Sequence, residues 1–418
     1  MRKTIIFVLC LAMVFMTTAC SEGSPLGKSN DPAVKNWELV KESGRDSVVT
    51  LCVDTQDEAA LTWLQTEFTA YLKLTYNIEL KLIKQSQEKT FESLKSDQQN
   101  EIQLGQYDLI LFDDTGFKEA VNAGYLFGPF TDELPNSKLY LDPYDIEVRY
   151  DEGISIDQYE VPIGRQQLSF IFNENYFYEI PEHYEGFFEL VKTFQGKFTY
   201  PDPRVSPEGE AFVAGYLSRN LDFEKLNEKA YSEAELYELI KPSLEVLSAI
   251  KPDLYKGGTD YPKSVNEMDQ LFFSEDLIFS MSLDYYHATD MLKAYEYPEA
   301  ANVFTIMEGT TGPVAHMGIL YNSSNKSGAM LVIDAMLSPE MQASKYDTRK
   351  WRQLPIYDPS YVSSEALAEI KKIKLKTTAL KHDELLLHRV PELSPYYRAL
   401  IVKLWEAHVL TNTAEVTP

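Results

Sequence analysis

Polar side chains that follow predicted buried strands are the residues of this sequence best placed to do chemistry. Asp113, Asp114 and Thr115 come directly after the largely apolar run at residues 108–112, which we expect to be a strand covered on both faces. Their oxygens can accept hydrogen bonds from a ligand or contact a cation. The same residue types are also good N-caps for the helix expected to follow. Both roles stay open for these three residues.

Two later segments carry polar residues in comparable places. Arg165 and Gln166 lie just before a predicted strand at residues 168–172. A residue there can hold a ligand oxygen or form a structural contact; we assign a ligand contact to Gln166 and leave Arg165 open. Tyr200 and Asp202 follow a further predicted strand, and the prolines on either side of Asp202 restrict its backbone. We expect both to face a ligand.

The start of the predicted helix near residue 209 indicates the charge of the ligand. Ser206 precedes Pro207, a favoured first helical residue, so Ser206 is interpreted as a cap. Glu208 and Glu210 stand in the first turn, where they already satisfy the positive end of the helix dipole. A bound anion is therefore less favoured at this helix than a neutral or cationic solute.

Asp284 and Tyr285 end another predicted strand, at residues 277–283. An aromatic face there can bind a sugar, or an organic cation through the ring quadrupole, although the ring could equally serve packing. Thr310 lies in a turn bounded by Gly309 and Gly312, whose backbone amides can meet a ligand. The turn has no Lys at Walker spacing, so it is not a phosphate-binding loop.

Catalytic motifs are missing from the sequence. The six His residues show no HExxH or HxH spacing for a zinc site, and there is no GxSxG elbow. Phosphotransfer of the haloacid-dehalogenase type would need a second Asp where Thr115 stands. Cys52 lies in an apolar strand, where a thiol is usually inert. A secreted glycosidase stays as the enzyme alternative, because two carboxyl groups about 5–10 Å apart cannot be recognised from sequence.

The N-terminus has the features of a signal peptide. Arg2 and Lys3 precede an apolar run at residues 5–15, which is too short to span a membrane. Cys20 follows small residues and resembles the lipidated Cys of bacterial lipoproteins. Thr17 stands where Leu is usual, so ordinary cleavage nearby stays as the alternative. We expect a signal peptide at residues 1–19, then a lipidated Cys20 on a flexible tether that extends to residue 45.

Composition limits the partners and the number of domains. The formal net charge of −25 argues against nucleic acid or an anionic membrane surface as a partner. A mature chain of about 380 residues exceeds what one hydrophobic core usually supports, so two domains are expected. Of the three Cys residues only Cys52 would remain free, so no disulfide stabilises the protein and its core must do so.

Strand-like and helix-like segments alternate along the chain, which predicts an α/β fold with parallel strands. The helix at residues 59–74 is the clearest, since Leu61, Leu64, Phe68 and Leu72 recur at helical spacing. The expected strands are residues 48–53, 78–83, 108–112, 168–172, 197–200, 277–283, 303–307 and 318–321. The other expected helices are residues 91–96, 117–122, 184–193, 209–218, 232–250 and 326–337.

Four motifs occur in an order that resembles a known family. They are DLILFDDTGFKEAVNAGYL at residues 108–126, VPIGRQQLSFIFNE at 161–174, YPDPR at 200–204, and GILYNSSNKSGAM at 318–330 followed by LSPEMQ at 337–342. Together they resemble the extracellular solute-binding proteins of ABC importers, family 1-like, and most of all the YnjB-type binding proteins. The similarity extends over almost the whole mature chain.

The resemblance implies the type II periplasmic-binding-protein fold, with two α/β lobes, a hinge and a ligand cleft between the lobes. One lobe would comprise residues 46–160 and 316–345, the other residues 161–315 and 346–418. The rule that ligands lie beyond the carboxyl ends of parallel strands agrees with this geometry. Closure about the hinge would bury the solute and form the surface that the permease reads.

The resemblance also implies a monomeric receptor without cofactor or catalysis, lipid-anchored at the outer face of the cell membrane. Its partners would be a small solute and the membrane permease of an ABC importer. The acidic and aromatic candidates favour a sugar or an organic or metal cation over an anion. Two other functions stay open: a secreted glycosidase, and a surface sensor or adhesin domain on the same fold.

The proposed lipid anchor is directly testable. Wild-type protein should partition with membranes, whereas Cys20→Ala should release the protein or stall its processing. A single acyl chain binds only marginally, so stable attachment requires the full lipoprotein modification. Membrane fractionation with mass spectrometry of the mature N-terminus measures both properties. Wild-type protein recovered wholly from the medium with an unmodified N-terminus would contradict the anchor.

Overall fold

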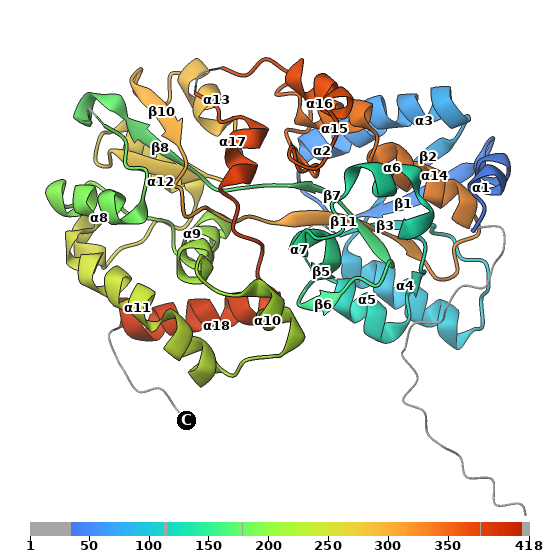
Figure 1. Cartoon of the computed structure of the whole chain (residues 1–418), viewed down its shortest axis with the longest axis horizontal. Helices are drawn as coiled ribbons and strands as arrows, with labels where there is room; N and C mark the ends of the chain where they lie inside the picture. The colour runs from blue at the N-terminus through green and yellow to red at the C-terminus, as the bar shows by residue number, and fades with distance from the viewer. Residues whose placement is uncertain (1–34, 113–114, 178, 377, 412–418) are drawn as a thin grey trace, which may run out of the picture.

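Two α/β lobes lie side by side, each built on its own sheet (Figure 1). The computed structural model describes residues 35–112, 115–177, 179–376 and 378–411. The first lobe holds the larger sheet, with strand order β12-β7-β11-β3-β1-β2, and the second a three-stranded sheet with order β10-β8-β9. Each sheet is covered by its own large cluster of buried apolar side chains. The predicted two-lobed α/β architecture is therefore confirmed.

The sheet of the first lobe is mixed rather than wholly parallel. β1 (Val48–Val53) pairs in parallel with β2 (Glu79–Lys84) and with β3 (Leu109–Phe112). β11 (Val314–Leu320) then runs antiparallel to β3 and to β7 (Glu160–Arg165). Two short strands complete the sheet: β4 (Leu126–Phe127) on β11 and β12 (Leu354–Pro355) on β7.

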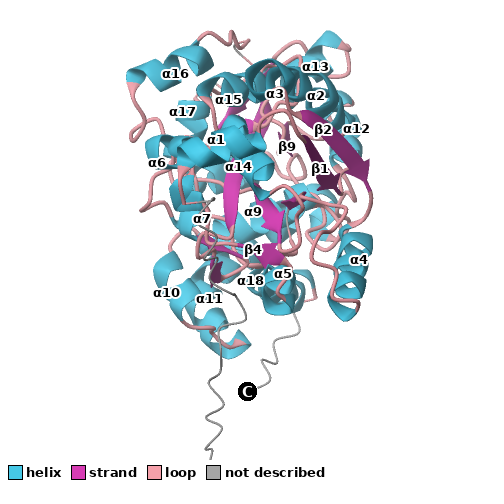
Figure 2. Cartoon of the chain, turned by 90° about the vertical axis from the view of Figure 1, so that its right-hand side faces the viewer, coloured by secondary structure: helices cyan, strands magenta, loops and turns pink. Residues whose placement is uncertain are grey.

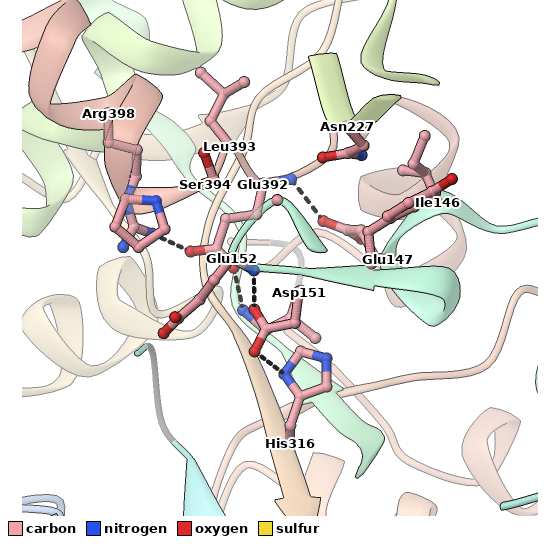
Figure 3. A pocket seen from close by; sticks show the side chains of 14 residues that line it. Ile146, Glu147, Asp151, Glu152, Asn227, His316, Glu392, Leu393, Ser394 and Arg398 are labelled. Carbon is pink, nitrogen blue, oxygen red and sulfur yellow. Dashed lines mark hydrogen bonds and ion pairs between the residues drawn. The ribbon is translucent and has the colours of Figure 1, made fainter. Parts of the chain in front are cut away.

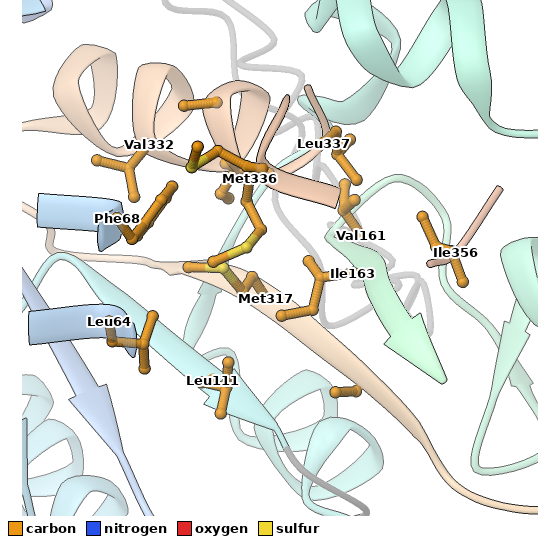
Figure 4. Close-up of a cluster of buried hydrophobic side chains, with 14 of the residues drawn as sticks. Leu64, Phe68, Leu111, Val161, Ile163, Met317, Val332, Met336, Leu337 and Ile356 are labelled. Atoms are coloured by element: carbon orange, nitrogen blue, oxygen red, sulfur yellow. The ribbon is translucent and has the colours of Figure 1, made fainter. Parts of the chain in front are cut away.

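Helices cover both faces of this sheet, as the alternating side chains of β3 show. Leu109 and Leu111 join one core, whereas Ile110 and Phe112 join a smaller core on the other face. α4 and α5 contribute to the smaller core, and α1 and α14 lie together on the opposite side (Figure 2). In the larger core, Met317 of the sheet meets Met336 of α14 (Figure 4).

The helices of the first lobe include the one that the sequence predicted most clearly. That segment is built from α2 (Glu58–Trp63), a π-helical turn (Leu64–Phe68) and α3 (Thr69–Tyr76), and its four periodic apolar residues are buried. The other helices of this lobe are α1 (Trp37–Gly44), α4 (Gln87–Gln99), α5 (Phe117–Ala123), α6 (Pro135–Tyr140), α7 (Ile146–Arg149), α14 (Lys326–Met336), α15 (Pro339–Tyr346) and α16 (Ser364–Lys371).

The sheet of the second lobe is antiparallel throughout, and its strands are β8 (Ser169–Asn173), β9 (Phe279–Ser282) and β10 (Ala301–Phe304). The strand expected at residues 197–200 does not form. Its backbone makes only separate hydrogen bonds, in which the carbonyls of Lys197 and Phe198 accept from Ile278 and Tyr255. The helices are α8 (Tyr184–Thr193), α9 (Pro207–Ser218), α10 (Phe223–Glu228), α11 (Glu233–Ile250), α12 (Val265–Phe273), α13 (His287–Lys293) and α18 (Pro395–Trp405).

Several segments lie elsewhere than the expected boundaries imply. Residues 37–44, expected in a flexible tether, form α1, which is capped by Asn36 and packs on α14. β7, expected in the second lobe, pairs within the sheet of the first. Residues 346–371 also pack with the first lobe, because Trp351 and Leu367 are buried in its core. The chain returns to the second lobe only after α17 (His382–Leu387), with α18.

Three segments cross between the lobes and are hydrogen-bonded to one another. They are residues 166–168 after β7, residues 305–313 before β11, and residues 388–394 before α18. The amides of Gln166 and Leu168 donate to the carbonyls of Pro313 and Thr311, and Val390 donates to Thr310. We call these three segments the hinge; they lie in the middle of Figure 1. No helix in the described part of the chain is long and apolar enough to cross a membrane.

Candidate functional site

Two adjoining cavities lie beside the hinge; the smaller is lined by residues of both lobes, and the larger by the hinge and the second lobe. The hinge cavity has a volume of about 20 Å³ and lies between Asp151 of the first lobe, His316 of β11 and Asn227 of α10 (Figure 3). The cleft cavity has a volume of about 200 Å³. Both are lined by Glu392 and Arg398, so the two cavities are neighbours. Their position beside the hinge makes these two cavities the candidate site for a ligand.

The wall of the cleft cavity combines apolar surface with a few polar groups. Its lining residues come from α9, from the hinge, from the end of β9 and from α18; they are Gln166, Pro207, Glu210, Ala211, Ala214, Leu283, Thr311, Gly312, Pro313, Glu392, Leu393 and Arg398. Two carboxylates thus face one guanidinium. Arg398 lies 3.3 Å from Glu210 and also pairs with Glu392. The cavity surface is acidic with one cation at its centre.

A buried ion network fixes the hinge itself. Glu147 of α7 is 5% exposed and accepts hydrogen bonds from Nε and Nη2 of Arg389, at 2.7 and 2.9 Å. Arg165, at the end of β7, lies 3.3 Å from the same carboxylate and pairs also with Asp145. Arg389 donates further to the carbonyls of Gln166 and Gly312. Two carboxylates and two guanidinium groups therefore join all three hinge segments to the first lobe.

The charge state of Glu147 follows from these contacts. Burial alone would raise its pKa, but Arg389, Arg165 and the amide of Glu392 outweigh burial and lower the pKa of this carboxyl. Glu147 therefore stays ionised at neutral pH and keeps both guanidinium groups in place. No motif in the sequence marks Glu147, which lies in a polar stretch and meets Arg389 only in the folded chain.

Of the predicted ligand-binding residues, Gln166 alone lines the cleft cavity through an exposed side chain. Thr310 lies nearby but is 1% exposed, and its hydroxyl donates to the carbonyl of Leu168 at 2.6 Å. Thr115 is exposed beside Gly116, the residue that precedes α5. Asp113 and Asp114 lie outside the described residues.

The other predicted residues have structural contacts. Tyr200 is fully buried and its hydroxyl accepts from the indole of Trp405 at 2.9 Å. Asp202 is 1% exposed and pairs with Arg204 and Lys263, at 2.8 and 2.6 Å. Burial alone would raise the pKa of Asp202, but these two cations hold it well below its ordinary value. Neither side chain is available to a solute here.

Asp284 and Tyr285 connect the lobes rather than line a cavity. Asp284 lies 3.0 Å from Arg352, and Tyr285 is 2% exposed with its hydroxyl donated to the carbonyl of Tyr346 in α15. Because the ring of Tyr285 packs into the core of the first lobe, it offers no face for stacking on a solute. The residues that do line the cleft cavity, Glu392 and Arg398, were not recognised from the sequence.

The family of the chain follows from comparison with known proteins. Residues 66–372 match the family of bacterial extracellular solute-binding proteins. The chain belongs to this family. Solute-binding proteins of ABC importers capture a small ligand outside the cell and deliver it to a membrane permease, and the cavities beside the hinge lie where two lobes can enclose one.

Relatives of this solute-binding protein agree with its two-lobed fold. The protein YnjB of Escherichia coli is 25% identical over 338 residues, which cover 78% of this chain and 83% of that protein. A sugar transporter structure from Rhizobium etli in an open conformation superposes with a TM-score of 0.63 at 14% identity, over 88% of this chain and 95% of the other. A spermidine/putrescine substrate-binding protein from Streptococcus pneumoniae superposes with a TM-score of 0.54 at 13% identity, over 86% of this chain and 99% of the other.

The buried ion network makes a stability prediction. Glu147→Gln should lower the free energy of unfolding by about 3–5 kcal/mol, because it leaves two guanidinium groups buried without their shared carboxylate. The contribution of Glu147 is fully present above the ordinary carboxyl pKa of about 4.3 and is lost as the pH falls through its lowered folded pKa. The difference between wild type and variant should therefore shrink in acid.

Urea unfolding at neutral and acidic pH measures this difference. Glu224→Gln is the control, because Glu224 pairs with Arg149 at the surface and should change stability by no more than about 1 kcal/mol. A Glu147→Gln variant as stable as wild type at neutral pH would show that the network does not hold the hinge.

Proposed function

We propose that this solute-binding protein captures a small organic cation in the cleft cavity and passes it chemically unchanged to the permease of an ABC importer. The acidic wall of the cavity carries the proposal: Glu210 and Glu392 contribute two carboxylates against the single guanidinium of Arg398. In the adjoining hinge cavity Glu152 adds a further carboxyl group. An anionic solute would meet like charge there, whereas a cation is attracted.

The size of the cavity supports a small solute. Its volume of about 200 Å³ is below the roughly 300–1,000 Å³ typical of sites for drug-sized ligands. A diamine or a monosaccharide is of suitable size, and an oligosaccharide is not. The apolar side chains of Ala211, Ala214 and Leu283 can contact the carbon chain or ring of the solute while the carboxylates receive its charge.

A sugar is the second candidate, and the lining ranks it below a cation. Sugar sites commonly offer an aromatic face, but the described lining of the cleft cavity contains no aromatic side chain. Carboxylates can still accept hydrogen bonds from hydroxyl groups. The structural relatives include one described as a sugar transporter and one described as a spermidine/putrescine receptor, so both classes occur on this fold.

The protein is extracellular by family, and we propose that Cys20 attaches it to the outer face of the cell membrane. Cys20 lies outside the described residues. The described chain begins at residue 35, just before α1, and Trp37 of α1 packs against the first lobe. The segment between Cys20 and α1 has about 16 residues, fewer than the expected tether, and would span roughly 50 Å if fully extended. That reach suffices for the protein to dock on a permease as a monomer.

Solute binding can be tested on the purified mature chain. Organic cations such as diamines should raise the melting temperature more than neutral sugars, and small anions should not raise it, because a ligand of the native state stabilises it. Calorimetry with the best ligand should show one site per chain, and the ligand should be recovered unchanged.

Gln166→Ala tests the position of the site. The variant should weaken binding about five- to a hundredfold, since a lost hydrogen bond in a cavity costs about 1–3 kcal/mol. The melting temperature without ligand should stay the same, because the side chain is exposed. Gln103→Ala, an exposed substitution elsewhere, should change neither property. Preferential binding of anions would contradict the proposed solute, and unchanged affinity of Gln166→Ala would contradict the proposed site.

A further inference from the structure

Three metal-ligating side chains meet at the first-lobe end of the hinge cavity. Asp151 ends β5 (Tyr150–Asp151), Glu160 begins β7, and His316 lies on β11. One potential ligand atom from each side chain lies within 4.8 Å of the other two. Glu160 is fully buried and His316 is 2% exposed. The sequence predicted no metal site, because its His residues show no metal-binding spacing and His316 is distant from both carboxylates along the chain.

Glu160 and His316 carry buried polar atoms that have no hydrogen-bond partner among the described residues. Both carboxylate oxygens of Glu160 are buried without a hydrogen bond, and so is Nε2 of His316. Nδ1 of His316 lies 3.9 Å from Oδ2 of Asp151, which is beyond hydrogen-bond distance. A buried carboxylate without a partner is costly, and native proteins rarely leave one so. The cluster therefore requires something between its three side chains.

Strand pairing in the first lobe brings these three side chains together. β7 and β11 are antiparallel neighbours, in which Glu160 stands opposite Gly318 and His316 opposite Pro162. Glu160 and His316 are therefore diagonal neighbours on one face of the sheet, at a separation that long side chains bridge. The β5–β6 hairpin, where β6 is Ile154–Ser155, brings Asp151 over this face. Oδ1 of Asp151 accepts from the amide of Glu152, which leaves Oδ2 directed toward His316 (Figure 3).

We propose that Asp151, Glu160 and His316 bind a divalent transition-metal ion, with Zn²⁺ the best match. One imidazole nitrogen and two carboxylate oxygens form a ligand set that such ions prefer, and two carboxylates balance the charge of the ion. Tetrahedral bonds of about 2.0–2.2 Å place two ligand atoms about 3.3–3.6 Å apart. The three ligand atoms, which lie within 4.8 Å of one another, would therefore have to approach by at most about 1.5 Å.

The surroundings complete the coordination. Asp151 and His316 line the hinge cavity, whose volume of about 20 Å³ holds roughly one water molecule. A water there can serve as the fourth ligand. The ion would join the β5–β6 hairpin to the two strands that lead into the hinge, so its role is structural. The site is separate from the cleft cavity and does not depend on which solute the protein carries.

A proton is the alternative occupant of this space. Burial, followed by the neighbouring Asp151, raises the pKa of Glu160 well above its ordinary value, so without an ion Glu160 would be neutral. A proton between the two carboxyl groups would satisfy one oxygen of each. It would leave Nε2 of His316 without a partner, whereas a metal ion takes up all three side chains.

Metal binding by the purified mature chain decides between the two occupants. After treatment with a chelator, the protein should bind one equivalent of Zn²⁺ in calorimetry and retain it through gel filtration, as measured by elemental analysis. Zn²⁺ should raise the melting temperature, and addition of EDTA should reverse the rise. A chelator-treated protein that binds no Zn²⁺, Mn²⁺ or Co²⁺ stoichiometrically would overturn the proposal and leave the proton as the occupant.

Variants locate the ion. Glu160→Gln keeps the volume of the side chain and removes its charge, so the variant should fold and bind Zn²⁺ at least about tenfold more weakly. Asp151→Asn should also fold and bind Zn²⁺ at least about tenfold more weakly. His183→Gln is the control, because His183 is an exposed histidine beside a single carboxylate, Glu308, and should leave the affinity unchanged. Unchanged Zn²⁺ affinity in both site variants, with loss in His183→Gln, would place the ion elsewhere.

Discussion

The carboxylate of Glu147 between the guanidinium groups of Arg165 and Arg389 is the interaction on which the arrangement of the lobes depends. Through Arg389 it reaches two of the hinge segments at their carbonyls, and through the amide of Glu392 it fixes the third. Charges buried in this way are costly to separate, because each partner would be left without compensation. The hinge therefore has a defined geometry, and the cavities beside it are lined by the same segments.

A buried lysine holds β7 in the first lobe as well. Lys345 of α15 is fully buried and donates to the carbonyl of Ile163 in β7 and to the side chain of Gln353. Burial lowers the pKa of Lys345 well below its ordinary value, and its two hydrogen bonds satisfy the buried amine. β7 is thus held from α15 as well as from α7. Motion of one lobe against the other must then occur in the short segments that follow β7 and precede β11.

Much of the fold was predictable because its signals are local. The helix at residues 59–74 shows its apolar period directly, and β1 and β3 are continuous apolar runs. The lobe assignment of residues 346–371 was not predictable in the same way, since Trp351 and Leu354 would be apolar in either lobe. The strand expected at residues 197–200 failed for a similar reason: its apolar residues are buried, but no neighbouring strand pairs with them.

The site was less predictable than the fold, because the partner of a polar residue decides whether it is free to bind. Asp202 and Tyr285 follow strand-like segments as a ligand-binding residue would, yet Lys263 and Tyr346, both distant in sequence, engage them. Gln166 was recognised from its position before a strand, which is a local property. Glu392 and Arg398 are recognisable only in the folded structure, where they line the cleft cavity opposite α9.

The central claim is that the two lobes close about the hinge around a solute, and small-angle X-ray scattering measures this most directly. The purified chain should be compared without ligand and at saturation with an organic cation that raises its melting temperature. The account predicts a smaller radius of gyration in the saturated protein, with no change in molecular mass. An unchanged radius of gyration at full saturation would show that the solute binds without closure and would contradict the account.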